Sequence, residues 1–395
     1  MSTINSIPNI KRRAWAEISL NNAEHNFRVI KEKVNSKICC VIKANAYGHG
    51  AVELAKLYER LGADFFAVSN IEEALQLRNN GISLPVLVLG YTSVECADVL
   101  AKNDITQCVF SYEYGLSLAK EASEKKVKVK IHIKLDTGMG RIGFLCHDGK
   151  SEINKIAEIC KLDCLESEGI FMHFAVADEG VDGEKFTREQ FNNFSKIIEQ
   201  LSKLGVEFKI KHCANSAAVF DYPEYHLDMV RAGVVLYGLQ PSEKIRNKAD
   251  LKPIMSLNSV ISHIKTLEKG QTVSYGRTYK ADKTTKIATV PIGYADGFRR
   301  ANGQGKYNLS VNGKSAEIVG RICMDQLMID VTNIDCEIGD KVLVFGENQP
   351  FTADRLAKIN NTINYEIICD VGERVPRAFV ENGEIISWKD DIIGE

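Results

Sequence analysis

The stretch Cys39-Cys40-Val41-Ile42-Lys43-Ala44-Asn45-Ala46-Tyr47-Gly48-His49-Gly50 decides how the chain is organised. An apolar run ends at Lys43, small residues and two glycines follow, and a helical pattern begins at Ala51. This order predicts a buried strand that delivers Lys43 to its carboxyl end, where the chain turns. Burial of the cation is expected to lower the pKa of Lys43, which suits its amine to Schiff-base chemistry. A lysine that merely extends from a strand end into solvent fits the same stretch.

Composition and charge restrict the class of protein. The chain has 395 residues, of which 45% are hydrophobic and 26% charged, so we expect a globular protein with a sizeable core and two or three domains. A net charge of -2 indicates neither a nucleic-acid nor a membrane-surface partner. Residues 1–13 lack the apolar core of a secretory signal and no apolar run is long enough to span a membrane, which predicts a cytoplasmic protein. The eleven cysteines are therefore expected to be reduced.

Short apolar runs alternate with helical patterns in the first 250 residues. Residues 14–20 alternate like a strand, and Asn21-Asn22 are expected to cap a helix that ends near residue 34. Eight further runs are expected to be strands: 37–43, 64–69, 86–89, 106–110, 127–135, 168–174, 208–212 and 227–231. Helical patterns separate most of them: 51–61, 71–80, 94–103, 112–124, 151–160, 185–204 and 216–220. This count predicts an N-terminal (β/α)8 barrel, and a doubly wound sheet is the alternative, although no early GxGxxG turn supports it.

The pattern changes near residues 251–253, so we expect a barrel over residues 1–250 and a smaller, mostly β domain over residues 251–395. Residues 1–20 could pack on this second domain. Its expected strands are 256–267, 286–291, 307–311, 314–318, 326–330 and 341–345, and only residues 353–360 look helical. The predicted fold class is thus α/β plus β.

A barrel places its active site at the carboxyl ends of its strands. The expected strand ends carry an unusual number of polar side chains: Lys43, Tyr47, Lys134, Arg141, His173, His212, Asn215, Ser216 and Arg231. Asn215-Ser216 could begin a short helix that binds a phosphate, and Gly233 would let the backbone approach it, although ordinary helix capping explains the same residues. A lysine together with a phosphate site suggests pyridoxal phosphate.

Several stretches resemble the alanine racemase family, in the order in which that family has them. Residues 41–50 (VIKANAYGHG) resemble its pyridoxal phosphate segment. The other matching stretches are 136–143 (DTGMGRIG), 230–233 (VRAG), 274–276 (SYG) and 320–325 (GRICMD). Because the resemblance covers nearly the whole chain, it implies the roles of individual residues.

By this resemblance, Lys43 would hold the cofactor and act as the base on one face of the substrate, and the partner subunit's Tyr275 would serve the other face. The residues implied to hold the cofactor are Lys43, Tyr47, Leu89, His173, Asn215, Ser216, Gly233 and Tyr365, with Arg231 facing the pyridine nitrogen. Arg141 and the Met324 backbone would bind the substrate carboxylate, and Lys134 would be carbamylated to fix Arg141. Asp178, Arg300 and Arg321 would line the entrance, and no metal is expected.

The resemblance implies a homodimer with shared active sites that interconverts L-alanine and D-alanine by a two-base mechanism and supplies D-alanine for peptidoglycan. Its partner would be a small amino-acid substrate, not a nucleic acid or a membrane. Three alternatives remain open at this point. The first is a barrel-type amino-acid decarboxylase, since such enzymes also place a cysteine near the active site, as Cys323 would be here. The second is a non-enzymatic carrier of the cofactor. The third is a racemase of broader specificity that also accepts serine.

Overall fold

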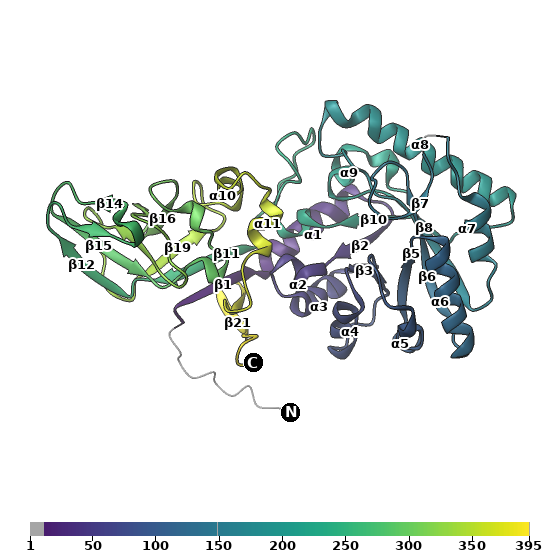
Figure 1. Ribbon diagram of the computed structural model, residues 1–395, viewed down its shortest axis with the longest axis horizontal. Coiled ribbons are helices and arrows are strands. Elements are labelled where there is room, and N and C mark those ends of the chain that lie inside the picture. Colours follow the sequence, from purple (N-terminus) through teal and green to yellow (C-terminus); the bar gives the residue numbers. More distant parts are fainter. Residues whose placement is uncertain (1–11, 148, 395) are drawn as a thin grey trace. The chain divides into compact units, whose positions relative to one another are not determined.

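The computed structural model describes residues 12–147 and 149–394, and the expectation for residues 1–11 lies outside the described residues. The chain forms two compact units. The barrel unit comprises residues 22–252, and the β unit comprises residues 12–21 together with 253–394. In Figure 1 the barrel unit runs from purple to teal, and the β unit is mostly green and yellow.

Eight parallel strands form the barrel unit in the order β10-β2-β3-β4-β5-β6-β8-β9. Their bounds are β2 (Lys37–Val41), β3 (Phe65–Val68), β4 (Val86–Val88), β5 (Ile105–Val109), β6 (Val129–Asp136), β8 (Leu165–Phe171), β9 (Ile210–His212) and β10 (Met229–Ala232). The first and last strands of this order are joined by backbone bonds from Asp228 N to Lys211 O (3.1 Å) and from Arg231 N to Ala214 O (2.9 Å), so the barrel is nearly closed. The predicted (β/α)8 barrel is confirmed.

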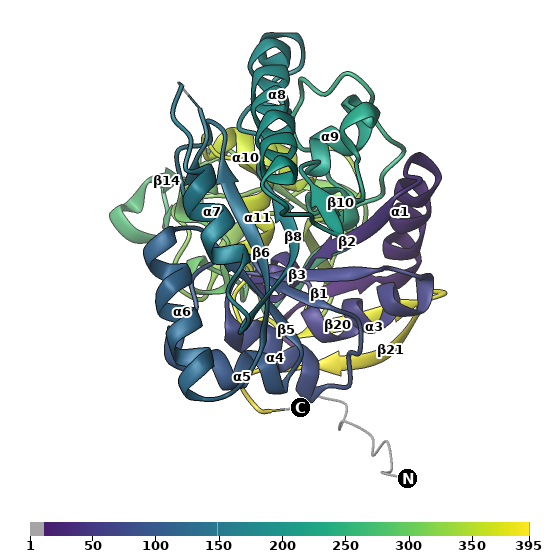
Figure 2. The same ribbon diagram turned by 90° about the vertical axis from the view of Figure 1, so that its right-hand side faces the viewer.

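Helices surround these strands, as Figure 2 shows. The helices of the barrel unit are α1 (Leu20–Lys33), α2 (Lys43–Tyr47), α3 (Ala51–Leu61), α4 (Ile71–Asn79), α5 (Ala97–Lys102), α6 (Tyr112–Glu124), α7 (Ile153–Cys160), α8 (Val181–Lys203) and α9 (Ser216–Asp221). Because helices cover the outside and side chains fill the inside, every residue of β3 is buried. Two predicted helix starts were wrong: Asn21-Asn22 lie inside α1, and α8 begins four residues before residue 185.

The β unit is built on a seven-stranded sheet in the order β17-β16-β19-β11-β1-β20-β21. Its bounds are β17 (Lys314–Glu317), β16 (Asn308–Val311), β19 (Lys341–Phe345), β11 (Met255–Val260), β1 (Ala14–Ser19), β20 (Arg377–Glu381) and β21 (Glu384–Lys389). The strand β1 pairs antiparallel with β11 and parallel with β20, so residues 14–19 lie within this sheet. A smaller sheet consists of β12 (His263–Leu267), β15 (Thr285–Val290) and β18 (Leu327–Asp330).

Two expectations for the β unit were wrong. Residues 256–267 are not one strand, because the chain leaves β11 at Ile261, whose N–H donates to Asp340 O, and enters a different sheet as β12. Residues 353–360 are not the unit's only α-helix: α10 (Ala353–Ile359) is followed by α11 (Asn364–Cys369). The second helix has only six residues, and its β-branched Ile367 and Ile368 are stabilised by burial rather than by helix propensity.

Candidate active site

Lys43 follows the carboxyl end of β2 and begins an unusual turn. The next four residues, Ala44 to Tyr47, have φ between 52° and 53°, so α2 is a left-handed helical turn. Its backbone bonds run from Ala46 N to Ile42 O and from Gly48 N to Ala44 O, each 2.9 Å long. Such a conformation costs about 1–2 kcal/mol per non-glycine residue, and strain of this kind concentrates at functional sites. The Lys43 side chain is half-buried at the start of this strained turn.

Three groups converge where β10 ends. Gly233 N donates to Ser216 Oγ at 2.9 Å, and Ser216 is the first residue of α9. A Cβ atom on Gly233 would lie 3.1 Å from the Tyr47 hydroxyl and 3.3 Å from Ser216 Oγ, so glycine lets both hydroxyls approach the backbone. The predicted cap is confirmed, because the Asn215 side chain accepts a bond from Ala218 N. Two hydroxyls beside a helix start form a set of donors that suits a phosphate group.

Arg231 is buried and donates to five acceptors. Its Nη1 atom donates to Nδ1 and the carbonyl of His212 at 3.1 and 3.3 Å. Its Nη2 atom donates to Met172 O (2.9 Å), His173 Nδ1 (3.2 Å) and Cys213 O (3.2 Å). Burial lowers the pKa of Arg231 to about 10, which leaves the guanidinium charged at neutral pH. This side chain is a fixed cation that cannot accept a proton.

The histidines around Arg231 are held neutral. Burial, and then the charge of Arg231, lowers the pKa of both His173 and His212 well below the ordinary value. Since His212 Nδ1 accepts a hydrogen bond from Arg231, the proton of its neutral imidazole is on Nε2, and this Nε2–H donates to Nδ1 of His132 at 2.9 Å. The Nε2 atom of His132 lies 3.4 Å from a carboxylate oxygen of Glu168. A continuous chain of polar groups thus runs through the barrel interior.

Lys134, on β6, carries a buried amine in the barrel. Its side chain is 3% exposed, and within residues 12–147 and 149–394 its Nζ atom has no hydrogen-bond partner. The amine lies 5.0 Å from the centre of the Phe171 ring. Burial, with a further contribution from the positive charges of Arg231 and Arg141, lowers its pKa to about 7. A large fraction of this buried amine is therefore neutral at physiological pH.

The remaining barrel residues of the predicted site lie in loops after the strands. Arg141 is exposed in the loop after β6, where the Asp136 carboxylate accepts bonds from Gly138 N and Gly140 N at 3.0 Å each. Leu89 directly follows β4 and is half-buried. Asp178 lies after β8, and burial raises the pKa of its carboxyl group.

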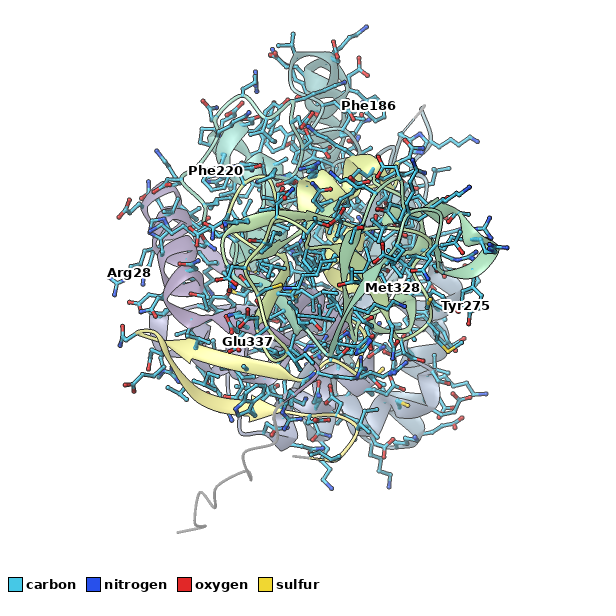
Figure 3. All side chains as sticks on the ribbon, turned by 90° about the vertical axis from the view of Figure 1, so that its left-hand side faces the viewer. Arg28, Phe186, Phe220, Tyr275, Met328 and Glu337 are labelled. Carbon is cyan, nitrogen blue, oxygen red and sulfur yellow. The ribbon has the colours of Figure 1, made fainter. Side chains whose placement is uncertain are left out.

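Tyr275, which is labelled in Figure 3, belongs to the β unit, and its side chain is 66% exposed. The preceding Ser274 has φ of 67°, a value that non-glycine residues rarely adopt. Its hydroxyl donates to Arg321 O at 2.6 Å and lies 3.8 Å from Cys323 Sγ. The loop that carries Tyr275 is therefore fixed to the segment that carries Arg321 and Met324.

The β unit also contains a cavity of about 380 Å³ beside that segment. Its lining is mixed aromatic and charged: Tyr294, Ala295, Gly297, Arg299, Arg300 and Asp370. Arg300 is exposed, whereas Arg299 is neutralised by Asp370 at 2.6 Å and by Glu366. Tyr365 lies on α11 and is half-buried.

Sequence reasoning had assigned no role to several residues that the fold brings to these sites. His212 stood at a predicted strand end without a partner, and nothing in the pattern connected it with His132 or Glu168. Gln190 of α8 was also missed, although it is fully buried and bonds His173 O at 3.2 Å and Ala175 N at 2.9 Å.

No side-chain group of three or more metal-ligating residues occurs in the described parts of the chain. Among the helices that the structure describes, none has the length and apolar character needed to cross a membrane.

Comparison with known proteins extends over both units. Residues 18–241 match the model of "Alanine racemase, N-terminal domain", and residues 254–379 match that of "Alanine racemase, C-terminal domain". Alanine racemase 1 of Clostridium acetobutylicum is 43% identical over 380 residues, which cover 95% of this chain and 97% of that protein. The solved alanine racemase of Clostridium difficile 630 superimposes with a TM-score of 0.92 at 43% identity, covering 97% of this chain and 99% of that one. The alanine racemase of Bacillus anthracis with bound L-Ala-P has a TM-score of 0.90 at 38% identity and covers 97% of this chain and 98% of its own.

Proposed function

The chain belongs to the alanine racemase family, because the models of both domains of that family match it in order. We propose how its own residues carry out the reaction of that family. The chain is an isomerase that interconverts L-alanine and D-alanine. Pyridoxal phosphate as its cofactor, a homodimer with shared active sites, and supply of D-alanine to peptidoglycan are parts of the proposal.

The groups around Gly233 fit a phosphorylated cofactor. A Cβ atom at this position would fill the space between the Tyr47 hydroxyl and Ser216 Oγ, so the glycine keeps open a site lined by two hydroxyl donors. Tyr47, Ser216 and the Gly233 backbone would hold the phosphate, with Asn215 fixing the start of α9. Leu89, His173 and Tyr365 would contact other parts of the cofactor.

When bound, pyridoxal phosphate supplies an electron sink that acidifies the Cα–H bond of an attached amino acid. Inversion at Cα requires one group that removes a proton on one face and another that returns a proton on the opposite face. Lys43 Nζ would serve the face of D-alanine, and the phenolic oxygen of the partner subunit's Tyr275 would serve that of L-alanine. These two groups lie on different units of the chain, so contributions from two subunits are compatible with the site.

Arg231 would face the pyridine nitrogen. Its bonds to His173 and His212 fix the position of the guanidinium, and its pKa of about 10 keeps it charged, so it can share a proton but not accept one. A carboxylate in this place would favour a protonated ring nitrogen. Arg231 therefore limits the delocalisation of negative charge away from Cα and disfavours side reactions such as transamination.

Arg141 and the backbone N–H of Met324 would bind the substrate carboxylate. The amine of Lys134, which has no hydrogen-bond partner in the described residues and is neutral in a large fraction of molecules, could combine with carbon dioxide to form a carbamate with release of one proton, and the resulting anion would fix Arg141. Asp178, Arg300 and Arg321 would line the approach to the site.

The arrangement of Tyr47, Ser216 and Gly233 is the observation that carries this proposal. It is tested by an absorbance spectrum of the purified protein and by chiral analysis of L-alanine incubated with it. We expect a yellow protein and the appearance of D-alanine until both enantiomers are equal. A colourless protein that leaves L-alanine unchanged after addition of pyridoxal phosphate would contradict the proposal, and release of carbon dioxide would indicate the decarboxylase alternative.

A further inference from the structure

The carboxylate of Asp296 is completely buried in the β unit and is held by several donors. Arg13 donates to both of its oxygens, from Nη2 to Oδ1 at 2.6 Å and from Nη1 to Oδ2 at 3.0 Å. Gly293 N donates to Oδ2 at 3.0 Å, and Arg374 Nε lies 3.7 Å from Oδ1. A buried charge is retained only when it is paired in this way, so these contacts fix the turn of residues 293–297.

That turn is bonded to the backbone on either side of the Met324 N–H. Tyr294 N donates to Cys323 O at 3.2 Å, and Ala295 N donates to Met324 O at 3.0 Å. The approach is so close that a Cβ atom on Gly293 would lie 2.3 Å from each of these two carbonyl oxygens. Any shift of the turn must therefore move the peptide group that contains the Met324 N–H.

A second contact holds the far side of the same peptide. Arg374 Nη2 donates to Asp325 Oδ1 at 2.8 Å, so one arginine connects Asp296 with the residue that follows Met324. Cys323 N, on the near side, donates to Gln326 O at 2.9 Å. For the Met324 N–H itself, no acceptor is found among the residues that the structure describes. The segment is thus fixed at both flanks while this donor stays available.

We propose that Asp296 is a positioning residue that orients the Met324 N–H toward the carboxylate of the amino-acid substrate. This inference rests on the proposed function, which assigns the substrate carboxylate to Met324. Asp296 acts without touching the substrate: it fixes the Gly293 turn, and the turn fixes the peptide. A donor oriented before binding loses less freedom when the ligand arrives, so its loss of orientation weakens binding more than it slows the subsequent chemistry.

The test compares Asp296→Asn with a matched control, Asp340→Asn, in the full-length protein. Asp340 lies in an exposed turn of the same unit, where its carboxylate accepts bonds from Glu337 N at 3.0 Å and from Asn312 Nδ2 at 2.9 Å. Steady-state kinetics give KM and kcat for alanine. Selective ¹⁵N labelling of the seven methionines, with Met324→Leu to assign one signal, follows the Met324 amide during titration with propionate, a probe that carries only the carboxylate.

For Asp296→Asn we expect KM and the propionate dissociation constant each to rise about tenfold, as for loss of one charge-assisted hydrogen bond, with kcat changed by less than about threefold. Asp340→Asn should match the wild type in all three quantities. An Asp296→Asn protein that folds and binds propionate with unchanged affinity would overturn the positioning role. The same holds if its KM and kcat change by equal factors while the Met324 amide still responds normally.

Two further results keep the inference separate from the proposed function. If Asp296→Asn does not fold, the Arg13→Lys variant is tested instead, because lysine retains the charge but can bond only one carboxylate oxygen at a time. A rise in KM smaller than the tenfold expected for Asp296→Asn would support the inference. Unchanged binding of propionate would overturn it. If the Met324 amide of the wild type does not respond to propionate while the enzyme still racemises alanine, the carboxylate assignment is wrong and the role of Asp296 is rejected with it. A wild type without racemase activity would instead reject the proposed function.

Discussion

The Nη1 atom of Arg231 donates a hydrogen bond to Nδ1 of His212 at 3.1 Å. This bond places the single proton of the neutral imidazole on Nε2, from which it is donated to His132. A chain of hydrogen bonds from the Arg231 cation through two neutral histidines toward Glu168 is thereby fixed inside the barrel.

Replacement of Arg231 by lysine is expected to destabilise the barrel strongly. Arg231 satisfies five acceptors, whereas an ammonium has three N–H groups, so at least two acceptors would lose their donor. We expect the free energy of unfolding to fall by about 2–4 kcal/mol, since each unsatisfied buried polar group costs about 1–3 kcal/mol. Urea denaturation checks this. Arg28→Lys, at an exposed position paired with Glu24, is the control and should change stability little.

Lys134 should make stability depend on pH. The unfolded chain holds this proton up to the ordinary pKa of 10.5, whereas burial lets the folded protein release it near pH 7. The cost of burying the cation is therefore complete below pH 7 and disappears as the pH rises from 7 to 10.5. In carbon-dioxide-free buffer, Lys134→Met should stabilise the protein most at pH 7 and below, and its advantage should shrink by about 1.4 kcal/mol per pH unit above 7.

Denaturation at several pH values measures this advantage, with exposed Lys120→Met as a control that should show no such trend. An advantage that stays constant between pH 7 and 9.5 would mean that Lys134 keeps an ordinary pKa. Addition of ¹³C-labelled carbon dioxide should produce a carbamate signal in the wild type and not in Lys134→Met.

The cofactor is expected on Lys43 and not on Lys134, although burial lowers the pKa of Lys134 to about 7. Lys43 lies at the end of β2 at the start of the turn that leads to Tyr47, whereas the Lys134 amine is enclosed beside Phe171. Borohydride reduction followed by peptide mapping should find the label on Lys43. Lys134→Gln should retain the label and Lys43→Ala should lose it; a label on Lys134 in the wild type would contradict the assignment.

Two inactive chains should complement each other if Tyr275 acts across subunits. A dimer that combines Lys43→Ala with Tyr275→Phe would contain one site that retains both groups and one that lacks both. We expect the mixed dimer to recover measurable racemase activity, while each variant alone has very little. Differently tagged chains allow the mixed dimer to be isolated, and an isolated mixed dimer without activity would indicate that both groups come from one chain.

Tyr275→Phe should separate the two proton transfers. The variant keeps Lys43, so it should still exchange the Cα proton of D-alanine with deuterated solvent much faster than that of L-alanine. Loss of a general acid or base typically slows a reaction by ~10²–10⁴-fold, and racemisation should fall by a similar factor. Proton NMR of each enantiomer in D2O measures both exchange rates. Equal rates for the two enantiomers would exclude a separate base on each face.

The positions of the strands and the polar residues at their ends could be predicted from the sequence, because both are local properties. Apolar runs of four to eight residues bounded by turn residues predict buried strands, and the residue after each run must lie at a strand end. Lys43, Ser216 and Gly233 were found in this way, and Ser216 and Gly233 do meet. The same reasoning did not predict the left-handed conformation of Ala44 to Tyr47, because of these four residues only Asn45 is of a type that visits this conformation, and then as a single residue.

The tertiary structure alone decided which residues from distant segments of the chain come into contact. The pKa of Lys134 falls to about 7 because the fold encloses its amine near Arg231, and no hydrogen-bond partner for this amine lies in the described chain. The sequence pattern did not indicate this shift, and the lowered pKa expected for Lys43 stays a prediction. Likewise, Asp296 meets Arg13 across 283 residues of sequence. Burial and charge pairing depend on the groups that packing brings together, so a pattern read along the chain cannot reveal them.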